Sequence, residues 1–198
     1  AATFTVDAVD DFYSDNGEKY QVTISNPVGG YRSYDIVTIS EATVTTAIKD
    51  DTVTDPYANS GATESDSTDT ISIKLFAIDG AGNRVAANEI AEGSTPQYVA
   101  VAFDKNGVEL NIGGTVNVTF TTGSAGSSDF TTTSQTVTLG TPFSTATRDD
   151  FIADNNETFT VAIVDRTFSD AATYESIDID TTAVTTTIKD DTVTDPYA

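Results

Sequence analysis

The sequence predicts an all-β protein built of antiparallel β-sandwiches, and three observations lead to this prediction. Apolar residues alternate with polar residues over short segments, β-branched residues are frequent in those segments, and Gly, Asn, Asp and Ser turns separate them. No segment carries the apolar spacing of an amphipathic helix. We therefore expect two packed sheets whose alternate side chains share one core.

The expected strands follow this alternation along the chain. In the first part, strands are expected near Phe4–Ala8, Glu18–Ser25 and Thr43–Lys49. Beyond residue 70, the same pattern predicts strands at Ile71–Leu75, Val99–Phe103, Val116–Phe120, Val137–Leu139, Phe159–Ile163 and Val184–Ile188.

An internal repeat sets the domain organisation. The decapeptide KDDTVTDPYA spans Lys49–Ala58 and recurs, 140 residues later, at Lys189–Ala198. Upstream, Asp10-Asp11-Phe12 matches Asp149-Asp150-Phe151 at an offset of 139. A repetition of this length indicates a slice of a tandem array.

The repeat predicts two unequal units. Residues 1–52 match only the C-terminal half of a unit, residues 53–69 form an acidic linker, residues 70–191 form a complete sandwich, and residues 192–198 start the next linker. The first unit has too few strands to close a two-sheet core. Its unpaired edges favour self-association. The missing half is expected either from another chain, from a second copy, or from sequence upstream of an inserted domain.

The composition excludes several classes of function. The chain carries 31 acidic against 9 basic side chains, a formal charge of −22, which disfavours nucleic acid and anionic membranes as partners. No apolar run approaches the roughly 20 residues of a membrane span. The absence of Cys and His removes thiolate chemistry and imidazole general bases. An enzyme is not expected, since the acidic residues lie on short polar loops with no Trp platform.

Carboxylates gather at the expected strand ends, and the loops of a sandwich cluster at its two poles. Several carboxylates at one pole repel one another unless a cation with oxygen ligands, above all Ca²⁺, lies among them. Solvated strand ends that favour solubility are the alternative. The candidate ligands in the complete unit are Glu92, Asp129, Asp149, Asp150, Asp154, Glu157, Asp190 and Asp191. Those in the incomplete unit are Asp10, Asp11, Asp15, Asp50 and Asp51.

Two other residue types recur beside these carboxylates. Lys49 and Lys189 precede the closing aspartate pairs and are expected to form salt bridges across the acidic pole. Phe12 and Phe151 follow the other aspartate pairs and are expected to plug the end of the sandwich.

Four strings together resemble the Calx-β domain, namely Glu92-Gly93, VNVTFTTGSAGSSDF, RDDFIADNNETFTVAIVD and IKDD. That family is an immunoglobulin-like sandwich found in sodium–calcium exchangers and in repeats of bacterial surface proteins. The resemblance covers roughly Ile71–Asp191, and Phe4–Asp51 resembles the second half of the same domain. It implies Ca²⁺ binding by Glu92, Asp129, Asp149, Asp150, Asp154, Asp190 and Asp191.

The near-identical repeat, the high Thr and Asp content and the lack of Cys also resemble the extender repeats of giant RTX-type bacterial adhesins. This resemblance implies an extracellular spacer on a bacterial cell surface, in contact with neighbouring repeats and serving adhesion or biofilm formation. The alternative is an adhesive module that binds a sugar or a peptide. The loop Asp79–Asn88 and the linker are its candidate surfaces.

Overall fold

The computed structural model describes residues 3–9, 11–14, 17–25, 43–49, 70–150, 152, 156–164 and 168–190. The predicted linkers at 53–69 and 192–198 lie outside these residues, so the proposed domain boundaries stay predictions. Within the described residues, no helix is long and apolar enough to cross a membrane.

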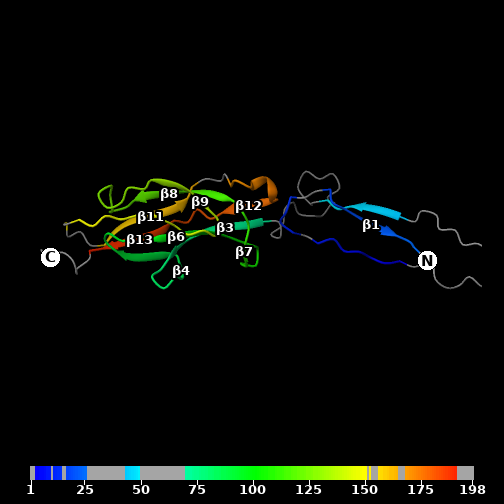
Figure 1. Ribbon diagram of the computed structural model, residues 1–198, viewed down its shortest axis with the longest axis horizontal. Coiled ribbons are helices and arrows are strands. Elements are labelled where there is room, and N and C mark those ends of the chain that lie inside the picture. The colour runs from blue at the N-terminus through cyan, green and yellow to red at the C-terminus, as the bar shows by residue number, and fades with distance from the viewer. Residues whose placement is uncertain are drawn as a thin grey trace, which may run out of the picture.

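The second unit is a sandwich of two sheets, which confirms the predicted all-β, immunoglobulin-like fold class (Figure 1). One sheet has the order β10-β6-β3-β12, with β4 paired to β3 and β7 to β6, and the other has the order β5-β13-β11-β8-β9. The strands of the first sheet are β3 (Thr70–Ile78), β4 (Arg84–Val85), β6 (Gln97–Phe103), β7 (Glu109–Leu110), β10 (Phe143–Ser144) and β12 (Ser176–Ile179). Those of the second are β5 (Ala87–Ala91), β8 (Thr115–Thr122), β9 (Ser134–Thr138), β11 (Glu157–Ile163) and β13 (Val184–Lys189). A short 3₁₀ turn, η2 (Ala171–Thr173), precedes β12.

The alternation seen in the sequence buries one face of each sheet. Along β3 and β11, every second residue is buried, as in the pattern of Ile71, Ile73 and Leu75. Aromatic rings fill the centre, where Tyr98 meets Phe120 edge to face with ring centroids 6.1 Å apart. These side chains form one continuous core between the sheets, which holds the loops at the two ends in place.

Two edge pairings are parallel rather than antiparallel. β12 runs parallel to β3, and β5 runs parallel to β13. Neither β5 nor β12 was predicted from the sequence. β5 has only one large apolar residue, Ile90, in a half-exposed ANEIA segment, and β12 is four residues long. Backbone pairing to an open sheet edge therefore defines these strands more than side-chain burial does.

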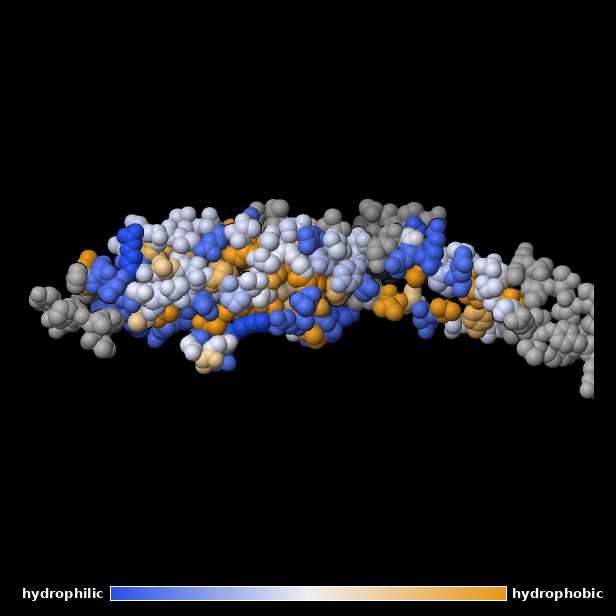
Figure 2. Space-filling model, viewed as in Figure 1, coloured by the Kyte–Doolittle hydropathy of each residue, from blue (hydrophilic) through white to orange (hydrophobic). Residues whose placement is uncertain are grey.

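In the first unit, β1 (Lys19–Thr23) pairs with β2 (Thr43–Ala47) in an antiparallel arrangement. The strand expected near Phe4–Ala8 is not formed, because no described segment pairs with it. Figure 2 shows hydrophobic residues exposed along this part of the chain. They include Phe4, Val9, Ile24 and Val44.

The two units lie end to end (Figure 1). Tyr13 forms an antiparallel bridge with Tyr174 of the second unit, and Phe12 packs against the core of that unit. Phe12, expected to plug the end of a sandwich, thus packs at the end of the sandwich of the second unit. Its counterpart Phe151 lies outside the described residues.

Candidate metal centre

Acidic segments that are far apart in the sequence meet at one end of the second unit. The backbone N–H of Glu92 donates to the Lys189 carbonyl over 2.8 Å, and Glu92 Oε1 accepts the backbone N–H of Asp150 over 2.9 Å. Arg148 donates its backbone N–H to the Asp129 carbonyl over 2.7 Å. The sandwich thus ties the segments carrying these carboxylates together, at the end opposite the first unit.

Close packing at this end requires the glycine of the Glu92-Gly93 pair. Gly93 has φ = +70°, and a Cβ placed on it would lie 3.0 Å from the Cβ of Asp149. Only glycine adopts this conformation readily and allows the approach. Gly93 also donates its backbone N–H to the Arg148 carbonyl over 3.2 Å. Gly93 therefore lets Glu92 and the Asp149-Asp150 pair sit side by side.

Asp129 is positioned by the aromatic residue that follows it. Phe130 is buried and stacks on Phe159, with ring centroids 4.5 Å apart. The Asp129 side chain is itself buried, and its Oδ2 accepts the backbone N–H of Gly126 over 2.5 Å. A carboxylate that is already held in place loses less conformational freedom when it binds a cation.

Asp150 forms a hydrogen bond with the backbone two residues further along the chain. Its Oδ1 accepts the backbone N–H of Ile152 over 2.7 Å, a turn typical of aspartate. In the first unit, Asp11 Oδ1 accepts the backbone N–H of Tyr13 over 2.9 Å. The second aspartate of each pair therefore makes the same hydrogen bond, to the backbone N–H two residues further on.

Glu157 and Asp190 lie at neighbouring strand ends of the same pole. Glu157 is the first residue of β11 and pairs with Ile188, and Asp190 directly follows β13. Lys189 donates from Nζ to Asn156 Oδ1, and Nζ lies 3.6 Å from Glu89 Oε1. Lys189 thus forms an ion pair near the acidic pole.

The donor set suits a hard cation, since every candidate ligand is an oxygen. Within the described part of the chain, however, no three acidic side chains lie close enough together to hold a metal ion. Six candidates lie outside the described residues, namely Asp10, Asp15, Asp50, Asp51, Asp154 and Asp191. The described residues therefore bring donor segments to one pole, and the full coordination set stays a prediction.

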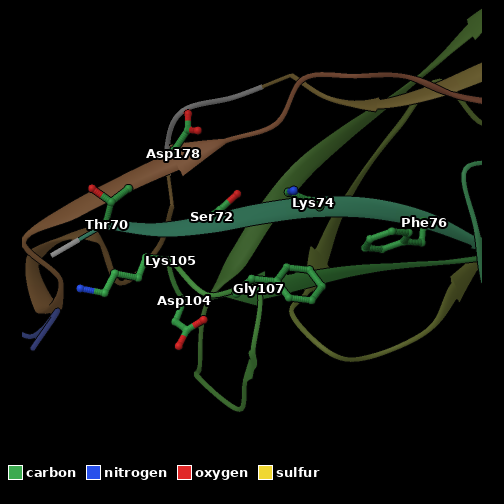
Figure 3. Close-up of a pocket in the computed structure, with 9 residues that line it drawn as sticks. Thr70, Ser72, Lys74, Phe76, Asp104, Lys105, Gly107 and Asp178 are labelled. Carbon is green, nitrogen blue, oxygen red and sulfur yellow. The ribbon is translucent and has the colours of Figure 1, made fainter. Parts of the chain in front are cut away.

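The structure also has a cavity of about 480 Å³ that the sequence did not predict, on the outer face of β3, β6 and β12 (Figure 3). Phe76 and Phe103 meet there edge to face, with ring centroids 6.1 Å apart. The signal in the sequence is Phe76, an aromatic residue at an outward position of β3. The lining residues are Thr70, Ser72, Lys74, Phe76, Phe103, Asp104, Lys105, Gly107 and Asp178.

Asp104 is the one lining carboxylate with a fixed orientation. Its Oδ1 accepts the backbone N–H groups of Val108 and Asn106, each over 2.8 Å. The hydrogen bond from Val108, helped by those from Asn106, lowers the pKa of Asp104 below its ordinary value. Asp104 is therefore ionised at neutral pH, beside Lys105 on the rim of the cavity.

The predicted recognition loop at 79–88 forms a tight hairpin that includes β4. Asp79 accepts hydrogen bonds from the side chain and the backbone of Asn83, and these bonds lower the pKa of Asp79. Arg84 forms a two-pronged ion pair with Glu109, at 2.7 and 2.9 Å. The polar groups of this loop are thus engaged in internal contacts.

No protein-family model matches the sequence, and no curated protein matches it. Among solved structures, an apo-form Calx CBD1 domain superposes with a TM-score of 0.42 and 15% identity, over 60% of this chain and 97% of that one. CBD12 from CALX1.2 gives 0.40 and 14% over 59% of this chain, and the calcium binding domain CBD12 of CALX1.1 gives 0.41 and 15% over 60%. The match covers 45% and 46% of those two longer chains.

Proposed function

We propose that this chain is a calcium-stabilised extender segment of a bacterial cell-surface adhesin. Sandwich units of this kind repeat in tandem and hold a distal ligand-binding region away from the cell. Ca²⁺ binds the acidic pole of the second unit, where it offsets the repulsion among carboxylates from separate loops.

The observation that carries this proposal is the backbone network at the acidic pole. Glu92, Asp129 and Asp150 come from three different loops, and hydrogen bonds between those loops hold them at one end. Carboxylates so placed in a chain of charge −22 destabilise the folded state unless a counter-ion is bound. Ca²⁺ that binds the folded state alone stabilises that state by mass action.

The spacer role is supported by the arrangement of the two units. They repeat one sequence, share the Asp-Asp turn, and lie end to end through Tyr13 and Tyr174. Repeated units whose contacts are limited to their neighbours form extended rods. Extension of this kind suits a protein that must reach beyond the cell surface.

Thermal unfolding of the full chain tests the calcium proposal. A hundredfold excess of Ca²⁺ over its Kd stabilises the fold by about 2.7 kcal/mol, so Tm rises by roughly 5–10 °C relative to chelator. Asp149→Asn keeps the side-chain size and reduces this rise. The exposed Asp178→Asn variant loses the same charge on β12 and keeps the full rise. Equal melting temperatures with Ca²⁺ and with chelator contradict the proposal.

A second candidate function rests on the cavity between β3, β6 and β12. Two aromatic rings, two lysines and the carboxylates of Asp104 and Asp178 line about 480 Å³. Rings pack on sugar C–H groups, lysines bind anions and carboxylates accept hydrogen bonds from hydroxyls, so the lining suits a sugar bearing a carboxylate. A glycan array probed with the full chain tests this function. Binding of acidic glycans that Lys74→Gln abolishes and Lys19→Gln, on β1, leaves intact supports it, and an array without binding contradicts it.

A further inference from the structure

The contact between the two units is built from backbone bonds and stacked rings. Ser14 donates its backbone N–H to the Thr173 carbonyl over 3.0 Å, and Glu175 donates to the Phe12 carbonyl over 3.2 Å. These bonds flank the bridge between Tyr13 and Tyr174. The contact is therefore a short antiparallel pairing between units.

Aromatic rings continue the core of the second unit into this contact. Tyr174 lies 5.8 Å from Phe168, centroid to centroid, and both are buried. On its other side, the Tyr174 ring lies 5.7 Å from Tyr13 and 6.3 Å from Phe12. The loop of the first unit thus packs on a ring that is anchored in the second.

The second unit repeats two hydrogen bonds of this segment at its opposite end. The turn from Asp150 to Ile152 repeats the turn from Asp11 to Tyr13. Further along, Asn156 donates its backbone N–H to the Ile188 carbonyl over 3.0 Å, as Gly17 does to Ile48 over 3.1 Å. At this end, Ile152 takes the place of Tyr13, and its side chain is 60% exposed.

We propose that Ile152, held by Asp150, docks on the Tyr174 end of another copy of the same unit. The occupant is identified by the first unit, whose equivalent loop is already seated on Tyr174. Ile152 packs on the partner ring where Tyr13 packs here. The two contacting surfaces differ from each other, so the contact does not close on itself and builds an open, head-to-tail rod.

This inference rests on the proposed extender role but does not require calcium. The contact is made by backbone N–H and carbonyl groups and by apolar side chains, and the candidate ligand Asp150 already accepts the backbone N–H of Ile152 without a cation. Rigidity at the junction and stabilisation by Ca²⁺ can therefore be measured separately.

A three-unit chain tests the proposal. Because Lys49–Ala58 and Lys189–Ala198 are identical, adding residues 59–198 after Ala198 recreates the natural junction without a foreign sequence. The chain has no Cys, so nitroxide labels can be attached at Ser134→Cys in the second unit and at the same position of the added unit. Pulsed electron spin resonance then gives the distance distribution across the new junction.

We expect one narrow distribution, both in Ca²⁺ and in chelator. Ile152→Asp, made in the second unit only, broadens it, since a charge is placed against the partner ring. Ile152→Tyr, which copies the first unit, keeps it narrow. Val108→Asp is the matched control, because Val108 is 58% exposed in the β6–β7 turn at the opposite end of that unit.

A broad distribution in the parent chain overturns the inference, and so does a narrow one that Ile152→Asp leaves unchanged. A distribution that stays narrow in chelator and broadens with Ile152→Asp supports the junction even if Ca²⁺ fails to raise Tm. Circular dichroism verifies that each variant keeps its sheet content.

Discussion

Two antiparallel strand pairs in this chain, β1 with β2 and β11 with β13, have related sequences and the same register, but very different surroundings. In the first unit, β1 pairs with β2 so that Tyr20 lies opposite Thr46. In the second, β11 pairs with β13 so that Phe159 lies opposite Thr186. These are corresponding positions in the repeat. The register is therefore the same with and without a covering sheet.

The two strand pairs differ in how far their side chains are buried. Ile163 is 1% exposed, whereas its counterpart Ile24 is 58% exposed. Val184 is 3% exposed, whereas Val44 is 59% exposed. The facing sheet built on β3 and β6 makes this difference. The sequences of the two strands thus encode their pairing, whereas stability comes from the sheet that covers them.

The largest expected loss of stability comes from truncating a buried isoleucine of β11, compared with its exposed counterpart in the first unit. Ile163→Ala destabilises the fold by about 2–5 kcal/mol, because it leaves a cavity between the sheets. Ile24→Ala changes stability by less than about 0.5 kcal/mol, because the side chain is exposed. Urea unfolding followed by circular dichroism measures both, and similar losses at the two positions contradict the comparison.

Unfolding at high pH tests the burial of Tyr98, a β6 residue that contacts β8 and β13. Burial raises the pKa of Tyr98 to about 12, an effect only partly offset by its hydrogen bond to Thr186. Because the unfolded chain then ionises first, stability falls between about pH 10 and 12, by about 1.4 kcal/mol per pH unit. Unfolding curves across this range should be steeper in pH for the parent chain than for Tyr98→Phe. Equal slopes contradict the account.

A smaller difference is expected at the buried hydroxyl of β13. Tyr98 OH donates to Thr186 Oγ1 over 2.6 Å, and Thr186 Oγ1 donates to Asn88 Oδ1 over 2.7 Å. Thr186→Val leaves both partners without this contact and costs about 1–3 kcal/mol. The equivalent Thr46→Val, in the exposed strand β2, is close to neutral. Equal losses of stability in urea unfolding would show that burial under the facing sheet does not strengthen this hydrogen bond.

The main strands could be predicted from the sequence because their alternation is strong. β3, β8 and β11 place an apolar residue at every second position, and the core forms along those positions. β5 and β12 carry too few apolar residues for such a signal, so pairing to a distant strand decides them. The packing of Phe12 against Tyr174 could not be predicted from the sequence either, because it depends on contact between two units.

The candidate metal site could be predicted only as a set of residues at one pole. Loops after different strands meet where a sandwich ends, which places Glu92 near Asp150 from topology alone. The sequence does not specify which oxygens converge, because this depends on side-chain rotamers and backbone ties. The bond from Gly126 to the buried Asp129 is such a tie.

The smallest expected effect concerns the residue just before the first strand of each pair. Asn156 has φ = +75° and Gly17 has φ = +106°, so both adopt the left-handed conformation. Asn156→Gly copies the first unit and changes stability by less than about 0.5 kcal/mol, whereas Asn156→Ala costs about 1 kcal/mol. The same urea titration checks both variants. Equal stability of the glycine and alanine variants contradicts this reading of the turn.

Calorimetric titration of the full chain with Ca²⁺ tests the central claim most directly. We predict saturable binding that Asp149→Asn weakens by at least about tenfold, equal to about 1.4 kcal/mol, and that Asp178→Asn leaves unchanged. Absence of binding, or equal binding by the parent chain and the Asp149→Asn variant, would contradict a calcium-stabilised pole.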